Sequence, residues 1–354
     1  MLYILQLFIR GKDMLFFEND YSTATHPEIL KRIGELNLEK LSGYGCDKVS
    51  ESAREKIRKV CERDDLEIFF LVGGTQTNAV MINSILRAYE GVVAVTTGHI
   101  STHEAGAIEY TGHKVLTIPQ HQGKMNPDEL KDYLVSFYND DLQTHSVYPG
   151  AVYVSHPTEY GTLYTKAELE KISSICEEYE IPFILDGARL GYGVSARETD
   201  VTMADIARLC DVFYIGGTKL GALFGEALVY KKENCQKHFS TFIKTHGALL
   251  AKGYVTGAQF DEFFTNDLYF KAGKHAIDMA EKLKAGLKAK GYKFYFESPT
   301  NLQFPILENE KVEELLKEVV FSFREKYDDN HTIIRLVTDW STKEEDVDKL
   351  LELF

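Results

Sequence analysis

The 354-residue chain is poor in cysteine, with five in all and no pair in a CxxC or zinc-like spacing. In a chain of this length, an odd number of scattered cysteines is typical of reduced, mostly buried thiols, which favours a cytoplasmic protein. The apolar stretch in residues 1–13 lacks a basic leader region and a small-residue cleavage site, and it is too short to span a bilayer. A second methionine, Met14, precedes sequence of ordinary globular character, so residues 1–13 are a candidate extension.

An excess of positive charge is also missing. The chain has 40 Lys and Arg against 54 Asp and Glu, a formal net charge of -14. Such an acidic surface disfavours binding to nucleic acid or to an anionic membrane. The sequence also has no basic patch interleaved with aromatic residues, which a nucleic-acid-binding protein would need. No His, Asp and Glu ligands cluster at helical spacing, so we expect no metal. A small anionic ligand in a locally basic pocket remains compatible with the composition.

Two phosphate-binding motifs are absent, GxGxxG and GK[ST], which disfavours dinucleotide and P-loop chemistry. Linkers, repeats and low-complexity tracts are absent as well. What the chain has is apolar material, with 44% hydrophobic residues, enough for a sizeable core. The length predicts one large domain and a smaller one.

Strands alternate with helices through much of the chain. The strands are near-continuous apolar runs, which predicts an α/β domain with a mostly parallel sheet covered on both faces. Strands are predicted at 66–74, 91–97, 114–119, 151–156, 181–190, 211–219 and 225–232, and helices at 51–63, 75–89, 104–112 and 166–180. Thr165 and Glu168 are spaced as a capping box for the last of these helices. We therefore expect an N-terminal segment at 1–50, a large domain at 51–259 and a smaller α+β domain at 260–354.

Polar or glycine-rich groups follow five of the predicted strands. They are Gly73-Gly74-Thr75-Gln76, Thr97-Gly98-His99, Ser155-His156-Pro157-Thr158-Glu159, Asp186-Gly187-Ala188-Arg189 and Gly217-Thr218-Lys219. In an open α/β sheet, ligands bind beyond the carboxyl ends of the strands. If the strands are parallel, the five groups meet at one edge of the sheet.

Three of these groups together suggest a cofactor. Residues 73–76 offer backbone N–H groups at a helix N-terminus, which suits a phosphate. Asp186 ends an apolar strand and needs a cationic or hydrogen-bonding partner, and Lys219 follows another such strand. Each feature alone is more simply a turn, an ion-pair member or a surface lysine. In this order, an anion cradle, a carboxylate and an amine match the needs of pyridoxal phosphate.

Four segments resemble one family in particular. "LDGARL", "YIGGTK", "GHISTHEAGAIEYTGHKV" and "IIRLVTDWSTKEED" resemble the threonine aldolase / beta-eliminating lyase family of the fold-type-I pyridoxal-phosphate enzymes, and the resemblance extends from Phe16 to the C-terminus. It implies that fold, with a mostly parallel sheet in the large domain and a smaller C-terminal α+β domain. It also implies a homodimer or homotetramer with active sites at the subunit interface. The implied reaction is cleavage of β-hydroxy-α-amino acids, L-threonine or L-allo-threonine, to glycine and an aldehyde.

The resemblance also implies roles for individual residues. Lys219 would bind the cofactor aldehyde, Asp186 would pair with its pyridinium nitrogen, and His99, five residues before Glu104, would stack on its ring in preference to His103. The expected phosphate ligands are Gly74, Thr75, Gln76 and Thr218. Arg189 would reach the cofactor's phenolic oxygen or the substrate carboxylate, and Arg335 and Asn19 would hold the substrate.

Two departures from the family pattern concern the substrate side. Glu159 stands where a second histidine is expected, and Asn19-Asp20 replaces a Ser-Asp pair. The base that takes the proton of the β-hydroxyl is therefore left open between His99, His103, Glu159 and water. The alternative function is a beta-eliminating lyase, or another pyridoxal-phosphate enzyme acting on a bulkier or aromatic amino acid. A non-catalytic binding module would not need the lysine, the aspartate and both arginines together.

Overall fold

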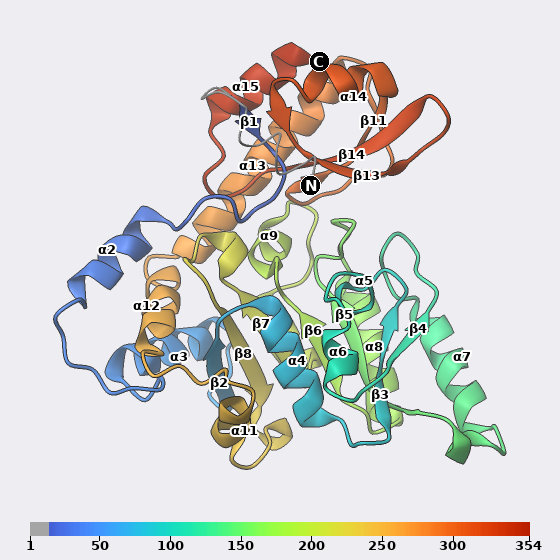
Figure 1. Ribbon diagram of the computed structural model, residues 1–354. Helices are drawn as coiled ribbons and strands as arrows, with labels where there is room; N and C mark the ends of the chain where they lie inside the picture. Colours follow the sequence, from blue (N-terminus) through green and yellow to red (C-terminus); the bar gives the residue numbers. More distant parts are fainter. Residues whose placement is uncertain (1–13) are drawn as a thin grey trace.

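A seven-stranded sheet forms the centre of the computed structural model, which describes residues 14–354 (Figure 1). The candidate extension at 1–13 lies outside the described residues. The strands are β2 (Leu66–Leu71), β3 (Glu90–Val95), β4 (Val115–Ile118), β5 (Tyr148–Ser155), β6 (Phe183–Asp186), β7 (Val212–Gly216) and β8 (Glu226–Lys231). Their order is β2-β8-β7-β6-β5-β3-β4, and β8 is antiparallel to both of its neighbours while the other pairs are parallel. The mostly parallel sheet predicted from the sequence is confirmed.

Helices cover both faces of this sheet because alternate residues of each strand point to opposite faces. Phe183 and Leu185 of β6 belong to one core cluster, and Ile184 between them belongs to the other. The first cluster includes residues of α3 (Lys48–Val60), α7 (Pro127–Tyr138), α8 (Lys166–Glu178), α10 (Met203–Leu209) and α12 (Tyr254–Phe263). The second includes residues of α4 (Gly74–Ile85), α5 (His99–Thr102), α6 (Ala107–Tyr110) and α11 (Phe239–Thr245).

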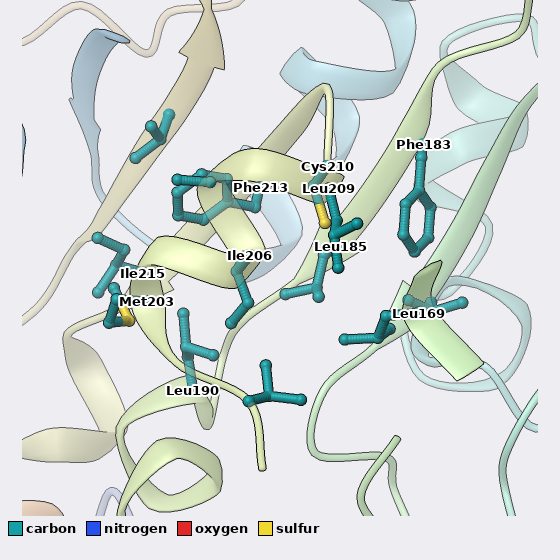
Figure 2. Packing of buried hydrophobic residues seen from close by; sticks show 14 of the residues in the cluster. Leu169, Phe183, Leu185, Leu190, Met203, Ile206, Leu209, Cys210, Phe213 and Ile215 are labelled. Atoms are coloured by element: carbon teal, nitrogen blue, oxygen red, sulfur yellow. The ribbon is translucent and has the colours of Figure 1, made fainter. Parts of the chain in front are cut away.

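The first cluster is shown from close by in Figure 2, where Met203, Ile206 and Leu209 of α10 lie beside Phe213 and Ile215 of β7. The helices on this face have local start signals as well. Thr165 and Glu168 form both bonds of a capping box at α8, as the sequence predicts. Packing and capping thus agree on where the helices of this face lie.

A smaller antiparallel sheet forms the second part of the molecule. Its strands are β9 (Lys293–Phe294), β10 (Leu302–Gln303), β11 (Pro305–Glu308), β13 (Ser322–Lys326) and β14 (His331–Val337), accompanied by α14 (Asn309–Leu315) and α15 (Glu344–Leu353). The long helix α13 (Leu268–Ala289) runs from the large sheet to this part (Figure 1). Other short elements are α2 (Pro27–Glu35), α9 (Leu190–Ser195), and the 3-10 turns η1 (Gln143–His145), η2 (Thr218–Leu220) and η3 (Lys232–Asn234).

The N-terminal residues of the described chain pair with the smaller part. β1 (Leu15–Phe16) lies parallel to β12 (Val319–Val320), and Phe17 accepts a hydrogen bond from the Val337 amide. The segment that follows, residues 18–20, continues from there toward the large sheet. The domain boundaries proposed from the sequence remain a prediction. None of the helices within residues 14–354 has the length and apolar character needed to cross a membrane.

Candidate active site

The five polar strand ends lie at one edge of the large sheet. β3, β5, β6 and β7 are parallel, and β2 has the same direction because β8 is antiparallel to both β2 and β7. The residues that follow these strands therefore leave the sheet on the same side. This is the convergence that the sequence predicts.

Asp186, the last residue of β6, is 2% exposed and accepts four hydrogen bonds. Tyr214 donates to Oδ1 at 2.6 Å and the Ala188 amide donates to the same atom at 2.9 Å. The Tyr153 hydroxyl and Asn78 Nδ2 donate to Oδ2. Burial alone would raise the pKa of Asp186, but the nearby His99 imidazole and the bonds from Tyr153, Tyr214 and the Ala188 amide outweigh it and hold the pKa below its ordinary value. Asp186 is therefore a buried carboxylate that stays ionised.

Asn78 links Asp186 to a second carboxyl group. Its Nδ2 donates both to Asp186 and to Oε1 of Glu104, at 3.1 and 2.9 Å. Burial raises the pKa of Glu104 to about 8, and the charge of Asp186 adds to this. His99 Nε2 lies 3.9 Å from the same Glu104 oxygen, and burial lowers the pKa of His99 to about 4. At neutral pH the site therefore contains a neutral imidazole and a protonated Glu104 beside an ionised aspartate.

Lys219 lies in the turn η2 directly after β7. The turn is fixed by the Tyr192 hydroxyl, which donates to the Lys219 carbonyl at 2.5 Å, and by Glu226, which binds Gly217 and Thr218. Burial lowers the pKa of the Lys219 amine, and the neighbouring positive charge of Arg189 lowers it further. A lowered pKa makes the amine more available as a nucleophile.

Arg189 is paired with Asp20, a residue to which the sequence pattern assigns no role. Its Nε and Nη2 donate to Asp20 at 2.7 and 3.0 Å, a bidentate pair. Asp20 is fully buried and also accepts from Asn301 Nδ2 at 3.1 Å. Guanidinium has five N–H donors, so three remain for the ligand role predicted for Arg189.

The first turn of α4 contains the predicted phosphate ligands Gly74, Thr75 and Gln76. Gly73 caps this helix, and a Cβ atom built on Gly73 would meet no atom within 4 Å. The first amides of a helix have no partner within it, so open space beside this turn exposes donors to an anion. Thr218, the fourth predicted phosphate ligand, uses its hydroxyl as donor to Glu226 and as acceptor from the Gly225 amide.

Glu159 follows β5 and is 9% exposed. The Ser155 hydroxyl donates to Oε1 at 2.7 Å, and Oε2 is buried without a hydrogen-bond partner among the described residues. Burial raises the pKa of Glu159 to about 7, and the charge of Asp186 contributes. Such a group can change its protonation state at physiological pH.

His103, the alternative to His99, is exposed, with its ring centroid 5.6 Å from that of His99.

Arg335 and the segment that contains Asn19 are connected through the smaller sheet. Arg335 lies on β14 and its Nε donates to the Ser322 hydroxyl at 3.1 Å. That hydroxyl donates in turn to the carbonyl of Glu18, the residue before Asn19, at 3.2 Å. The Asn19 side chain accepts from the Tyr21 amide and the Ser22 hydroxyl within its own turn. Ser322 of β13 therefore links Arg335 to the segment that contains Asn19.

Several side chains of this edge were not singled out from the sequence as site residues. In the sequence Asn78, Tyr153 and Tyr214 have the pattern of ordinary helix and strand positions, although all three donate to Asp186. One sequence signal indicates a buried charged group at this edge: Glu226 stands at the start of the apolar strand "GEALVY". Within residues 14–354, no group of three or more His, Cys, Asp or Glu side chains is arranged to hold a metal ion.

Comparison with known proteins gives a consistent result. The model of the beta-eliminating lyase family matches residues 17–310. The chain is 27% identical over 345 residues to a low specificity L-threonine aldolase of Pseudomonas aeruginosa, covering 95% of each chain. Among solved structures, a threonine aldolase of Leishmania major has a TM-score of 0.92 at 43% identity, covering 96% of this chain and 98% of the other.

A more distant likeness concerns the fold alone. A double mutant of the aspartate aminotransferase of Thermus thermophilus has a TM-score of 0.72 at 16% identity, covering 100% of this chain and 94% of the other. Together with the threonine aldolase structure, this likeness confirms the predicted fold type I, with a mostly parallel sheet and a smaller C-terminal part.

Proposed function

The chain belongs to the beta-eliminating lyase family, and from this premise we propose that it cleaves β-hydroxy-α-amino acids to glycine and an aldehyde with pyridoxal phosphate. The proposed substrates are L-threonine or L-allo-threonine. The names of the threonine aldolases that match over nearly the whole chain support this substrate class. The observation that carries the proposal is the meeting of Lys219, Asp186 and the first turn of α4 at one edge of the sheet.

The residues present fit this cofactor. Lys219 offers an amine with a lowered pKa, and Asp186 an ionised carboxylate that can keep a pyridine nitrogen protonated. The open space beside Gly73 suits a phosphate at the amides of Gly74, Thr75 and Gln76, with Thr218 nearby in sequence to Lys219. When bound, pyridoxal phosphate supplies an electron sink for the bond that breaks. The neutral ring of His99 is suited to stack on it.

Glu159 is the proposed base for the β-hydroxyl proton. A general base works best when its pKa is close to the working pH, and the pKa of Glu159 is raised to about 7. Its Oε2 has no partner among the described residues and can therefore accept a proton from a substrate. His99, with a pKa lowered to about 4, is the weaker base of the two. His103 or water would be the base if Glu159 proves dispensable.

Arg335, Asn19 and Arg189 are the proposed substrate contacts. A guanidinium binds a carboxylate with two parallel hydrogen bonds, which suits Arg335 for the substrate α-carboxylate. Arg189, anchored by Asp20, supplies positive charge close to Lys219. It would bind the cofactor's phenolic oxygen or the substrate carboxylate. Asn19 would orient the substrate from the N-terminal segment.

The proposed assembly is a homodimer or homotetramer with active sites at the subunit interface, in the cytoplasm. All five cysteines are free thiols, which supports a reducing compartment. Light scattering of the purified protein would measure the assembly.

The test is aldehyde release from L-threonine and L-allo-threonine by purified protein supplied with pyridoxal phosphate. We expect aldehyde and glycine from the wild type and none from Lys219→Ala. Because the family model is that of beta-eliminating lyases, release of ammonia and a 2-oxo acid is measured in parallel, with aromatic and other bulkier amino acids as further substrates. Ammonia without aldehyde would replace the aldolase proposal by the beta-elimination alternative.

A further inference from the structure

Glu226 is a buried carboxyl group beside Lys219 that the proposed reaction does not use. It opens β8, is 3% exposed, and lies opposite Leu71 of β2 and Gly216 of β7 in the sheet. A carboxylate removed from water in this way is costly unless donors replace the lost hydration. Two donors do so: the Gly217 amide to Oε2 and the Thr218 hydroxyl to Oε1, both at 2.8 Å.

Both bonds end on the two residues that immediately precede Lys219. The Thr218 hydroxyl also accepts from the Gly225 amide at 3.0 Å, which closes the turn between β7 and β8. On the other side of the turn, Tyr192 donates to the Lys219 carbonyl and Tyr269 donates to the Gly216 carbonyl. The backbone of Lys219 is therefore fixed from both sides, and Glu226 is the charged member of this arrangement.

Several titratable and charged groups surround Lys219. His99 of α5 and Glu104, which follows α5, lie within electrostatic range of it. Arg189 at the start of α9 opposes the ammonium, while Asp20, Asp186 and Glu226 favour it. Asp20 is already paired with Arg189, and Asp186 is shared among four donors. Glu226 accepts only from two neutral groups among the described residues, so its charge is the least compensated of the three.

The groups that face Glu226 in turn are Lys219, Asp186, Tyr214 and Tyr269. Lys219 is the only cation among them, and the two tyrosines remain neutral because burial raises the pKa of each. Burial also raises the pKa of Glu226 to about 7. Above neutral pH the group is therefore an anion with one cationic neighbour.

We propose that Glu226 is a positioning residue for Lys219: its carboxylate holds the turn that presents the lysine, and its negative charge strengthens the hold of Nζ on its proton. The proposal rests on the proposed function only in taking Lys219 as the reactive amine. It assigns to Glu226 a part, beside burial, Arg189, Asp20 and Asp186, in setting how much neutral amine the site contains at a given pH.

The test measures Lys219 directly in the protein freed of cofactor. Cyanate adds to neutral amines to give a carbamoyl group, so the rate of carbamoylation of Nζ, followed by peptide mass spectrometry between pH 7.5 and 10.5, reports the midpoint of its titration. Removing a nearby charge shifts such a midpoint by about one unit, so we expect Glu226→Gln to lower it by about one unit and to speed carbamoylation about tenfold below the midpoint. Lys326, whose side chain is 69% exposed, is the internal reference in the same digest.

Thr218→Val is the matched control, because it removes the hydroxyl that braces Glu226 and keeps the negative charge. We expect its Lys219 midpoint to stay close to that of the wild type. Glu226→Asp retains the charge at a greater distance and should give a smaller downward shift; it also keeps the test decisive if Glu226→Gln does not fold by circular dichroism. An unchanged midpoint in the folded Gln or Asp variant overturns the proposal, as does an equal shift in Thr218→Val. The measurement involves no substrate, so failure of aldehyde release would leave its result intact.

Discussion

At the scale of single residues, the four donors on Asp186 lead to a first prediction. Tyr214→Phe removes a hydroxyl that donates to Oδ1 at 2.6 Å inside a fully buried site. Hydrogen bonds to charged groups contribute about 1.5–3 kcal/mol, so we expect a loss of this size in the free energy of unfolding at pH 7. Urea denaturation of the cofactor-free protein would measure it.

Tyr269→Phe is the matched control for this prediction. Its ring is equally buried, and its hydroxyl donates at 3.1 Å to the neutral carbonyl of Gly216. A neutral acceptor makes the loss smaller, about 0.5–1.5 kcal/mol. Equal losses in the two variants would show that Asp186 is not ionised and would contradict its assignment as partner of a pyridinium nitrogen.

Glu159 gives a second prediction, on the pH dependence of cleavage. A base acts when deprotonated, so kcat/KM of the wild type should rise with pH through an inflection near 7, the value to which burial raises the pKa of Glu159. Glu159→Gln should lower kcat/KM by about 10²–10⁴-fold and remove the inflection. Ser155→Ala, which removes the donor to Oε1, should move the inflection to higher pH. An inflection that survives in Glu159→Gln would assign it to another group.

Sequence spacing located part of the site because strand ends are local features. Asp186 and Lys219 each follow an apolar run, and a parallel sheet brings such ends together. The partners of these residues could not be located in this way. Tyr153 and Tyr214 have the spacing of core residues, and only the pairing of β5, β6 and β7 brings their hydroxyls to one carboxylate.

At the scale of elements, the close approach of β6 and β7 leads to a third prediction. A Cβ atom on Gly187 would lie 1.9 Å from the Tyr214 carbonyl, a backbone atom of the neighbouring strand that cannot move aside alone. Gly187→Ala should therefore destabilise the protein severely, by more than about 3 kcal/mol, or prevent its folding. Thermal denaturation together with soluble yield would measure the effect.

Gly34→Ala is the control for the same chemical change. Gly34 lies in α2, and a Cβ atom there would meet nothing within 4 Å. Alanine is the better helix former, so this variant should gain up to about 1 kcal/mol. Tolerance of Gly187→Ala at wild-type stability would mean that the two strand ends lie farther apart than described.

The elements themselves differ in how far the sequence predicts them. The helix expected at 166–180 is α8, because its capping box and its apolar spacing agree. The strand expected at 225–232 is β8, but nothing in "GEALVYK" tells that it enters the sheet antiparallel between β2 and β7. The direction of a strand relative to the preceding one depends on the length of the connection between them. The short turn after Lys219 allows β8 only to pair antiparallel with β7. The helix expected at 104–112 is reduced to α6, with the left-handed Gly106 at its start.

At the scale of the whole molecule, the N-terminal segment joins the two sheets. Asp20 binds Arg189 beyond β6 and Asn301 before β10, residues separated from it by 169 and 281 positions. Such contacts leave no periodic pattern in the sequence, so the pairing of Arg189 with Asp20 cannot be predicted from it. A substitution that removes one partner of a buried ion pair leaves the other charge uncompensated. The packing of the large sheet against the smaller part therefore depends on Asp20.

Buried carboxyl groups give the last prediction, on how global stability depends on pH. The pKa of Glu104 is raised to about 8 in the folded protein, against 4.5 for the ordinary group. Between these values the folded state holds a proton that the unfolded state has released, so this group's contribution to stability is complete below pH 4.5 and is lost as the pH rises toward 8. The slope for one proton is about 1.4 kcal/mol per pH unit.

Glu104→Gln removes this titration and keeps an oxygen for the bond from Asn78. The difference in unfolding free energy between the variant and the wild type should therefore move in favour of the variant as the pH rises from 5.5 to 8, by about 1.4 kcal/mol per unit. Other titrating groups, such as His99 and Lys219, are common to both proteins and largely cancel in this difference. Urea denaturation of the two cofactor-free proteins across that range measures it, and parallel curves would mean that Glu104 is ionised in the folded state.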